Sequence, residues 1–171
     1  SALTSLNYLT LAYNDISDLS PLSVLTDLRS LWISGNPISD LEPLADLDSV
    51  WRVTAEGTRI VDVTPLGQME SLSVLWLDDN PISDLSPLAE LGSLTLLSAA
   101  NNRVGDLAWA ADSTLLEDLR LDDNEIADVT PLASATSLMR VQLENNQVTD
   151  LTPFVLNPGL SDGDSIHVEG N

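Results

Sequence analysis

The sequence contains no cysteine and no lysine, and these two absences already exclude several classes of protein. Without cysteine the chain forms no disulfide, offers no thiolate nucleophile and builds no zinc–sulfur site. Its cations are six arginines, against 27 acidic residues, which gives a formal net charge of −21. Such a charge repels the phosphates of nucleic acids and of anionic lipids. We therefore expect no nucleic-acid partner and no docking on an acidic membrane.

Long apolar runs and catalytic motifs are absent as well. No run reaches the roughly 20 apolar residues that span a membrane, so we expect no membrane insertion. No segment reads as a signal peptide, although a processed chain would have lost one. The only histidine, His167, has Ser165 and Asp164 nearby, but adjacent residues of a strand face opposite sides. We expect no enzyme, no cofactor and no metal site, and leave open whether an acidic cluster binds calcium.

What the sequence does have is a 22-residue repeat. Numbering each repeat from its first leucine or valine, positions 1, 4, 6, 11, 14 and 17 are apolar in all seven repeats. The repeats start near Leu6, Leu28, Val50, Leu72, Leu94, Leu116 and Leu138. Position 9 holds Asn14, Asn36, Thr58, Asn80, Asn102, Asn124 and Asn146. Position 13 holds Asp18, Asp40, Asp62, Asp84, Asp106, Asp128 and Asp150. Regularity of this kind is typical of repeat architectures.

The repeat predicts one strand and one short turn per 22 residues. Apolar residues at positions 4 and 6, with other types at 3, 5 and 7, indicate a strand with one buried face. Strands at this spacing leave no room for a hairpin return, so they stack in parallel as a solenoid. Ser or Thr followed by proline predicts a hydroxyl N-cap with proline at the first helical position of a 3₁₀ or α turn. The five hydroxyl residues are Ser20, Thr64, Ser86, Thr130 and Thr152.

The pattern L-x-x-L-x-L-x-x-N-x-I-x-D-L-x-P-L-x-x-L resembles the leucine-rich repeat in its 22-residue version. The wording Asn-x-Ile-Ser-Asp-Leu-Ser-Pro-Leu, in the segments ending at Leu22 and Leu88, is similar to internalin-type repeats of bacterial surface proteins. A eukaryotic phosphatase-regulatory family also uses a 22-residue repeat. The resemblance implies an α/β fold, with a parallel sheet on the concave face and short turns on the convex face. It also implies that the asparagines hydrogen-bond the backbone of neighbouring turns.

Two repeats depart from the pattern. In repeat 3, Ala55 occupies a core position and Thr58 replaces asparagine, so we expect a weaker contact there. In repeat 5, Ala99 and Ala110 occupy core positions and Trp109 replaces proline, so its packing must differ. The aspartates recur even in these two repeats. We therefore expect them to accept backbone N–H groups of the following turn rather than to bind cations.

We expect residues 1–171 to form a single leucine-rich-repeat domain. After Phe154 the register breaks. A partial repeat at 160–171 resumes it after an insertion of three residues, with Ile166 and Val168 at positions 4 and 6. Solenoids need polar caps to protect their ends. Neither cap is recognisable here, so the sequence favours a fragment of a longer chain.

Candidate functional residues are those that the repeat does not dictate. Aromatic residues and arginines, which are enriched at binding hot spots, gather at positions 2, 3, 5 and 8. Trp32 and Trp76 share position 5 and should stand about 10 Å apart on one face. Further along, arginines lie among acidic residues, where Asp118 and Arg140 either form a cross-strand ion pair or supply polar selectivity. The predicted ligand-binding residues are Tyr8, Tyr13, Arg29, Trp32, Trp51, Arg52, Trp76, Arg120, Asp122, Arg140 and Glu144.

These features favour a non-enzymatic recognition module over an enzyme. The expected partner is another protein, bound on the aromatic and arginine-bearing concave face. Carbohydrate binding on Trp and Tyr platforms is an alternative, and so is a spacer arm that presents other domains. By resemblance to internalin-type proteins, the setting would be extracellular or the surface of a bacterium, and the acidic composition suits a salt-adapted one. The sequence leaves the oligomeric state open.

Overall fold

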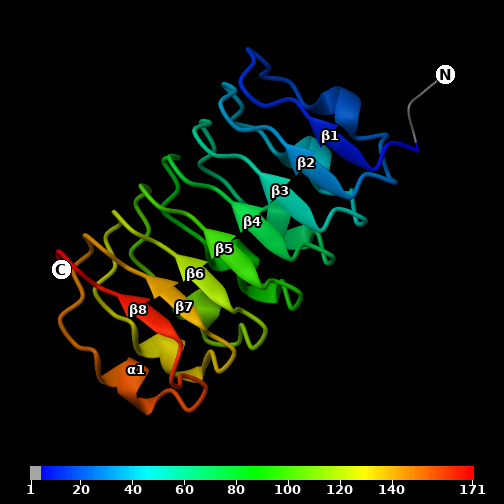
Figure 1. Ribbon diagram of the computed structural model, residues 1–171. Helices are drawn as coiled ribbons and strands as arrows, with labels where there is room; N and C mark the ends of the chain where they lie inside the picture. Colours follow the sequence, from blue (N-terminus) through cyan, green and yellow to red (C-terminus); the bar gives the residue numbers. More distant parts are fainter. Residues whose placement is uncertain (1–4) are drawn as a thin grey trace.

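The computed structural model describes residues 5–171, which form one row of parallel strands with short turns stacked behind it (Figure 1). The strands are β1 (Tyr8–Thr10), β2 (Ser30–Trp32), β3 (Arg52–Thr54), β4 (Val74–Trp76), β5 (Leu96–Ser98), β6 (Asp118–Arg120), β7 (Arg140–Gln142) and β8 (Ser165–His167). The 3₁₀ turns are η1 (Ser20–Leu22), η2 (Glu42–Leu44), η3 (Leu66–Gln68), η4 (Ser86–Glu90), η5 (Ala108–Ala110) and η6 (Thr130–Ser134). One α-helical turn, α1 (Thr152–Leu156), follows β7. The predicted leucine-rich-repeat solenoid is confirmed.

The strand register repeats every 22 residues until the last strand. Leu9 pairs with Leu31, and the same offset links each strand to the next as far as β7. Between β7 and β8 the offset is 25, because Val141 pairs with Ile166. The predicted three-residue insertion before the partial repeat is therefore confirmed. It places His167 beside Gln142, on the same side of the sheet.

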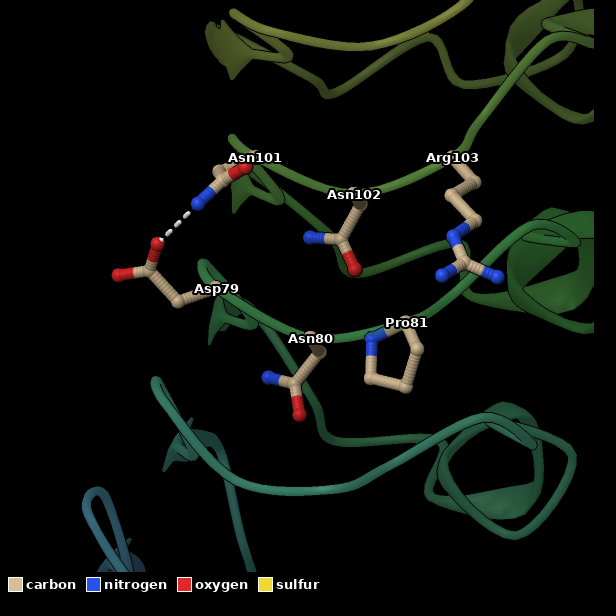
Figure 2. Close-up of a pocket in the computed structure, with 6 residues that line it drawn as sticks. All are labelled: Asp79, Asn80, Pro81, Asn101, Asn102 and Arg103. Carbon is tan, nitrogen blue, oxygen red and sulfur yellow. Dashed lines mark hydrogen bonds between the residues drawn. The ribbon is translucent and has the colours of Figure 1, made fainter.

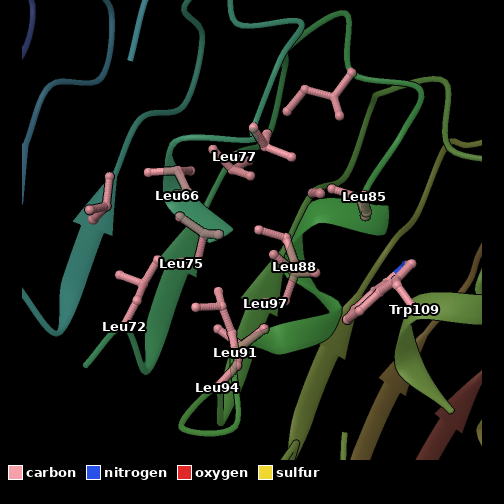
Figure 3. Packing of buried hydrophobic residues seen from close by; sticks show 14 of the residues in the cluster. Leu66, Leu72, Leu75, Leu77, Leu85, Leu88, Leu91, Leu94, Leu97 and Trp109 are labelled. Carbon is pink, nitrogen blue, oxygen red and sulfur yellow. The ribbon is translucent and has the colours of Figure 1, made fainter. Parts of the chain in front are cut away.

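The core lies between the sheet and the turns. It is a continuous stack of leucines, isoleucines and valines from the predicted apolar positions, part of which Figure 3 shows. Leu75 and Leu97, at position 4 of adjacent repeats, are fully buried. Trp109 is 5% exposed and belongs to this core, in a place where other repeats have proline. At the N-terminal end, Leu6 and Leu9 are only partly buried against the core.

The asparagines link consecutive repeats. Asn124 donates from Nδ2 to the carbonyls of Ala99 (2.9 Å) and Leu121 (3.1 Å), and its Oδ1 accepts the N–H of Val104 (2.8 Å). Thr58 is shorter and does not reach the corresponding N–H. That group, on Ile38, bonds to the carbonyl of Asn36 instead. The family-implied role of asparagine and the weaker contact expected at Thr58 are both confirmed.

The aspartates cap the turns, and the predicted hydroxyl caps are wrong. In all seven repeats the aspartate Oδ1 accepts the backbone N–H two residues later, at 2.8 or 2.9 Å. Ser20 is the first residue of its turn rather than the residue before it, and no hydroxyl caps any turn among residues 5–171. The N–H groups that a Ser20 hydroxyl cap would bond, on Leu22 and Ser23, donate instead to the backbone carbonyls of Leu19 and Ser20.

Lowering the pH should therefore weaken the solenoid through this row. Hydrogen bonds from the hydroxyl and the N–H two residues later hold the pKa of Asp18, Asp62, Asp84, Asp128 and Asp150 below its usual value. A depressed folded-state pKa stabilises the fold above the unfolded value of about 3.9. This contribution is lost as the pH falls through the folded pKa. We expect the thermal midpoint to drop steeply below about pH 4.

The measurement is thermal unfolding by circular dichroism between pH 7 and pH 2.5. A triple variant, Asp62→Asn, Asp84→Asn and Asp128→Asn, keeps an acceptor oxygen at each site but removes the titration. Its thermal midpoint should be lower than that of the parent chain at neutral pH, and should fall by less when the pH is lowered. An acid loss as steep as that of the parent chain would contradict the assignment.

Candidate functional site

The concave face is built by positions 3 and 5 of each repeat. Position 4 is buried in the core, so the residues on either side of it point away from the core. Trp32, Thr54 and Trp76 are register partners across β2, β3 and β4, and they put the two indoles on one face. Thr54 is 7% exposed, whereas both tryptophans are only partly buried. The register thus places the two tryptophans on one face, as the repeat predicts.

An arginine stacks on each of these tryptophans. The Cζ of Arg52 lies 5.3 Å from the ring centroid of Trp32, and that of Arg120 lies 5.1 Å from the ring centroid of Trp76. Both distances fall within the range of cation–π attraction. Each guanidinium is thereby held in place on the sheet. The sequence predicted these four residues as one face but not their pairing.

Asp118 holds the two arginines of the second half of the face. Its carboxylate accepts bonds from Arg120 at Nε (3.0 Å) and Nη2 (2.8 Å), and from Arg140 on the next strand. Burial alone would raise the pKa of Asp118, but the bonds from both arginines outweigh it and hold that pKa below the usual value. The cross-strand ion pair is confirmed. Arg52, by contrast, forms no ion pair with any residue of the range 5–171.

Three other predicted residues lie at the start of the strands or at the end of the sheet. Arg29 and Trp51 directly precede β2 and β3 and are exposed. Their backbones are joined, since the N–H of Trp51 donates to the carbonyl of Arg29 at 2.9 Å. Tyr8 lies on β1 and is 61% exposed. These side chains can extend the aromatic and cationic surface around Trp32 and Arg52.

The opposite edge, just after each strand, has a left-handed residue at position 8 of every repeat. The set with φ between 53° and 79° is Tyr13, Gly35, Gly57, Asp79, Asn101, Asp123, Asn145 and Gly170. Gly, Asn and Asp are the residues that tolerate this conformation. Tyr13 is the exception, and it is 82% exposed. The column of permissive residues was readable in the sequence but was not recognised there.

The polar members of this edge bond to one another. Asn101 donates from Nδ2 to Oδ1 of Asp79 at 2.6 Å, as Figure 2 shows, and Asn145 donates to Asp123 at 3.0 Å. In Figure 2 the side chains of Asn80 and Asn102 lie beside that pair, next to a cavity of about 320 Å³. The side-chain amides around this cavity already have hydrogen-bond partners. The amides of Asn80 and Asn102 also donate to the carbonyls of Ala55 and Leu77 in the preceding repeat, and so hold neighbouring repeats together.

Asp122 and Glu144, which were predicted to bind a ligand, occupy position 7. The Oδ1 of Asp122 accepts the N–H of Glu144 at 2.9 Å. Burial is the main cause of the raised pKa of Asp122. The Oε1 of Glu144 lies 3.6 Å from Nδ1 of His167. With Glu169 these groups put one imidazole nitrogen and two carboxylate oxygens within 4.8 Å of one another, a set that could hold a metal ion.

His167 was considered in the sequence only beside Ser165 and Asp164, and its grouping with Glu144 and Glu169 was not predicted. The three-residue insertion had been recognised, and applying it would have placed both residues next to Gln142 and Glu144. The predicted set thus divides into the sheet surface, the edge before the strands and the edge after them. No helix in residues 5–171 has both the length and the apolar character needed to cross a membrane.

A family model for leucine-rich repeats, in two copies, matches residues 4–46. Among solved structures, an internalin C2 from Listeria monocytogenes is 43% identical, with a TM-score of 0.89. That match covers 92% of this chain and 70% of the internalin C2. A second internalin from the same organism, inlF, is 33% identical with a TM-score of 0.83, over 93% of this chain. The chain spans about half of that protein's length, since the match covers 54% of it.

A plant protein is also similar. The leucine-rich-repeat ectodomain of the membrane receptor kinase GASSHO1/SCHENGEN3 from Arabidopsis thaliana was solved in complex with CASPARIAN STRIP INTEGRITY FACTOR 2. It is 26% identical with a TM-score of 0.79, and the match covers 92% of this chain and 21% of that one. No curated protein sequence matches the chain.

Proposed function

Because the chain belongs to the internalin-like leucine-rich repeat proteins, we propose that it is a non-enzymatic module that binds a protein partner on its concave face. Leucine-rich repeat domains generally mediate protein–protein interaction. The plant ectodomain, solved in complex with CASPARIAN STRIP INTEGRITY FACTOR 2, is one structural relative with a bound factor. The setting would be extracellular or the surface of a bacterium, in line with the Listeria internalins.

One observation carries the proposal. Trp32 and Trp76 stand on the same face, partly exposed, with Thr54 between them and an arginine stacked on each ring. Tryptophan and arginine dominate the binding energy of protein interfaces. The rings and guanidiniums are held by a hydrogen-bonded sheet, so little conformational entropy is lost when a partner binds. Arg29 and Trp51 would extend the contact beyond Arg52, and Arg140 would do so beyond Arg120.

The test begins with a screen of the chain against purified extracellular protein domains and, in parallel, against a glycan array. For the partner found, Trp32→Ala and Trp76→Ala should each weaken binding by about 30-fold or more, as expected for truncated hot-spot residues. Val61→Ala removes an exposed apolar side chain outside the strands and should change affinity less than about twofold. Circular dichroism checks that each variant is folded.

The other outcomes decide against the proposal. Binding to a glycan that is lost in Trp32→Ala would favour the carbohydrate alternative. Equal binding of the parent chain and both tryptophan variants, to every protein found, would leave the spacer-arm alternative.

A further inference from the structure

A recess lies at the edge of the sheet after β1 to β4, where the left-handed position carries glycine in two consecutive repeats. In later repeats this position holds the bonded pairs Asp79–Asn101 and Asp123–Asn145. In repeats 2 and 3 it holds Gly35 and Gly57. The row of side chains is therefore interrupted for two repeats. A cavity of about 420 Å³ occupies the interruption, lined by Tyr13, Gly35, Glu56, Gly57, Asp78 and Asp79. This volume lies within the range of small-ligand sites, roughly 300–1,000 Å³.

The floor of the recess is rigid and its wall is aromatic. Backbone bonds tie the loops together, from Tyr13 N–H to the Ser34 carbonyl (2.7 Å) and from Gly57 N–H to the Asp78 carbonyl (2.9 Å). The ring of Tyr13 lies against Gly35, since a Cβ atom there would be 2.5 Å from Tyr13 Cδ1. Nothing within 4 Å would meet a Cβ atom at Gly57. The ring therefore packs against Gly35, and the open space of the recess lies at Gly57.

The other lining groups concentrate negative charge. Glu56, Asp78 and Asp79 form no ion pair with any side chain in residues 5–171. Burial, and then the charge of Asp78, raises the pKa of Glu56. Asp78 uses Oδ1 to accept bonds from the Ser98 hydroxyl and the Ala100 N–H, both at 2.7 Å, and no bond reaches its Oδ2 from this part of the chain. Two further factors bear on the site: Arg52 offsets part of the charge of Glu56, and the −21 charge of the whole chain attracts cations.

We infer that this recess binds a guanidinium group, presented by an arginine side chain of the partner protein. The planar cation would stack on the Tyr13 ring and donate hydrogen bonds to the carboxylates of Glu56 and Asp78. A lysine ammonium cannot stack as a plane or donate in a fork, so arginine is preferred. The inference rests on the proposed function in one respect: the arginine belongs to a protein partner. It deepens that function by adding a cation-selective subsite beside the tryptophan surface.

The experiment uses N-acetyl-argininamide as the probe, which carries one guanidinium and no other charge. Ring carbon–proton NMR signals of tyrosine report binding, because the chain has only two tyrosines. Tyr13 should shift saturably, while Tyr8, which is also exposed, serves as the control in the same spectrum. N-acetyl-lysinamide should bind several-fold more weakly than the arginine probe.

Gly57→Asn is the decisive variant. Asparagine accepts the left-handed conformation, no atom blocks its Cβ, and its side chain would fill the recess beside Asp79 without changing the charge. It should lower the affinity for the arginine probe by about tenfold or more while the chain stays folded, because it removes the space in which the cation stacks. Glu56→Gln should lower the affinity for the arginine probe several-fold. Asp123→Asn makes the same charge change two repeats beyond Asp79 and should leave affinity within about twofold.

Three results would overturn the inference: no saturable shift of Tyr13, equal shifts of Tyr8 and Tyr13, or unchanged affinity in Gly57→Asn. A lysine probe that binds as tightly as the arginine probe would overturn the guanidinium preference. None of these results depends on a partner protein. The inference about the recess can therefore be wrong while the tryptophan variants still lose their protein partner. The reverse outcome is equally distinguishable.

Discussion

Asn80→Ala should destabilise the chain by about 3–5 kcal/mol, because it leaves the buried N–H of Ile60 without a partner and removes three hydrogen bonds to backbone carbonyls. Asn80 is 5% exposed. Its Nδ2 donates to the carbonyls of Ala55 (2.9 Å), Leu77 (3.0 Å) and Asp78 (3.1 Å). Its Oδ1 accepts the N–H of Ile60 (3.0 Å). The orphaned N–H costs about 1–3 kcal/mol and each lost hydrogen bond about 0.5–1.5 kcal/mol, although the three carbonyls keep other donors. The sum is a large part of a typical total stability of roughly 5–15 kcal/mol.

Thr58 makes this site more sensitive than its neighbours. Its hydroxyl donates to Oδ1 of Asn80 at 2.6 Å and to the Ala55 carbonyl at 3.1 Å. Asn80 therefore supports the contact between repeats 3 and 4 and also holds the residue that replaces asparagine in repeat 3. Because each repeat of a solenoid contacts only its neighbours, a break here separates the chain into two blocks. We expect urea unfolding to become less cooperative as well as earlier.

Asn14→Ala is the matched control. Asn14 occupies the same repeat position but is exposed, and its Nδ2 donates to the carbonyls of Leu11 and Ala12. The Leu11 carbonyl keeps a second donor, Nδ2 of Asn36. The loss should stay below about 1 kcal/mol, as for an exposed hydrogen bond. Equal losses in the two variants, measured by urea unfolding followed by circular dichroism, would mean that the contribution of asparagine does not depend on burial.

The fold was predictable because one 22-residue period fixes the place of nearly every side chain. The apolar positions predicted the core, the asparagine column predicted the contacts between repeats, and the three-residue insertion before Ile166 predicted the shifted register of β8. The same period placed Trp32 and Trp76 on one face. Repetition makes such inferences strong, since every repeat tests the same assignment.

The remaining features depend on side-chain conformation, which a repeat pattern does not encode. Nothing in the repeat pattern predicts that Arg52 stacks on Trp32, or that Asp118 holds Arg120 as well as Arg140. The hydroxyl caps failed because Ser20 lies inside its turn, and the N–H groups of Leu22 and Ser23 bond to backbone carbonyls instead. The recess beside Tyr13 was missed because it depends on which residues are small, namely Gly35 and Gly57. A search for residues that tolerate positive φ would have drawn attention to position 8.

The second large effect is expected at Trp109. Replacing this residue with the proline of the repeat consensus should destabilise the chain. Other repeats place proline here and leucine or phenylalanine at position 17, whereas this repeat has Trp109 followed by Ala110. Trp109 is 5% exposed and Ala110 is fully buried, so the indole supplies apolar volume that a larger neighbour supplies elsewhere. In Figure 3 its ring lies at the edge of the leucine cluster around Leu88. Truncating a buried tryptophan costs about 3–5 kcal/mol, and we expect this for Trp109→Ala.

Trp109→Pro should also destabilise, by about 2–4 kcal/mol, since stiffening the turn recovers only about 1 kcal/mol of the lost packing. Ala110→Leu alone should cost about 1–3 kcal/mol, because the indole already fills the space. The double variant, Trp109→Pro with Ala110→Leu, exchanges one way of filling the core for the other. It should unfold close to the parent chain in urea, so the two losses should largely cancel rather than add. Additive losses of stability would mean that the side chains at positions 109 and 110 do not fill the same volume. The Trp109 indole would then not take the place of the leucine that this repeat lacks.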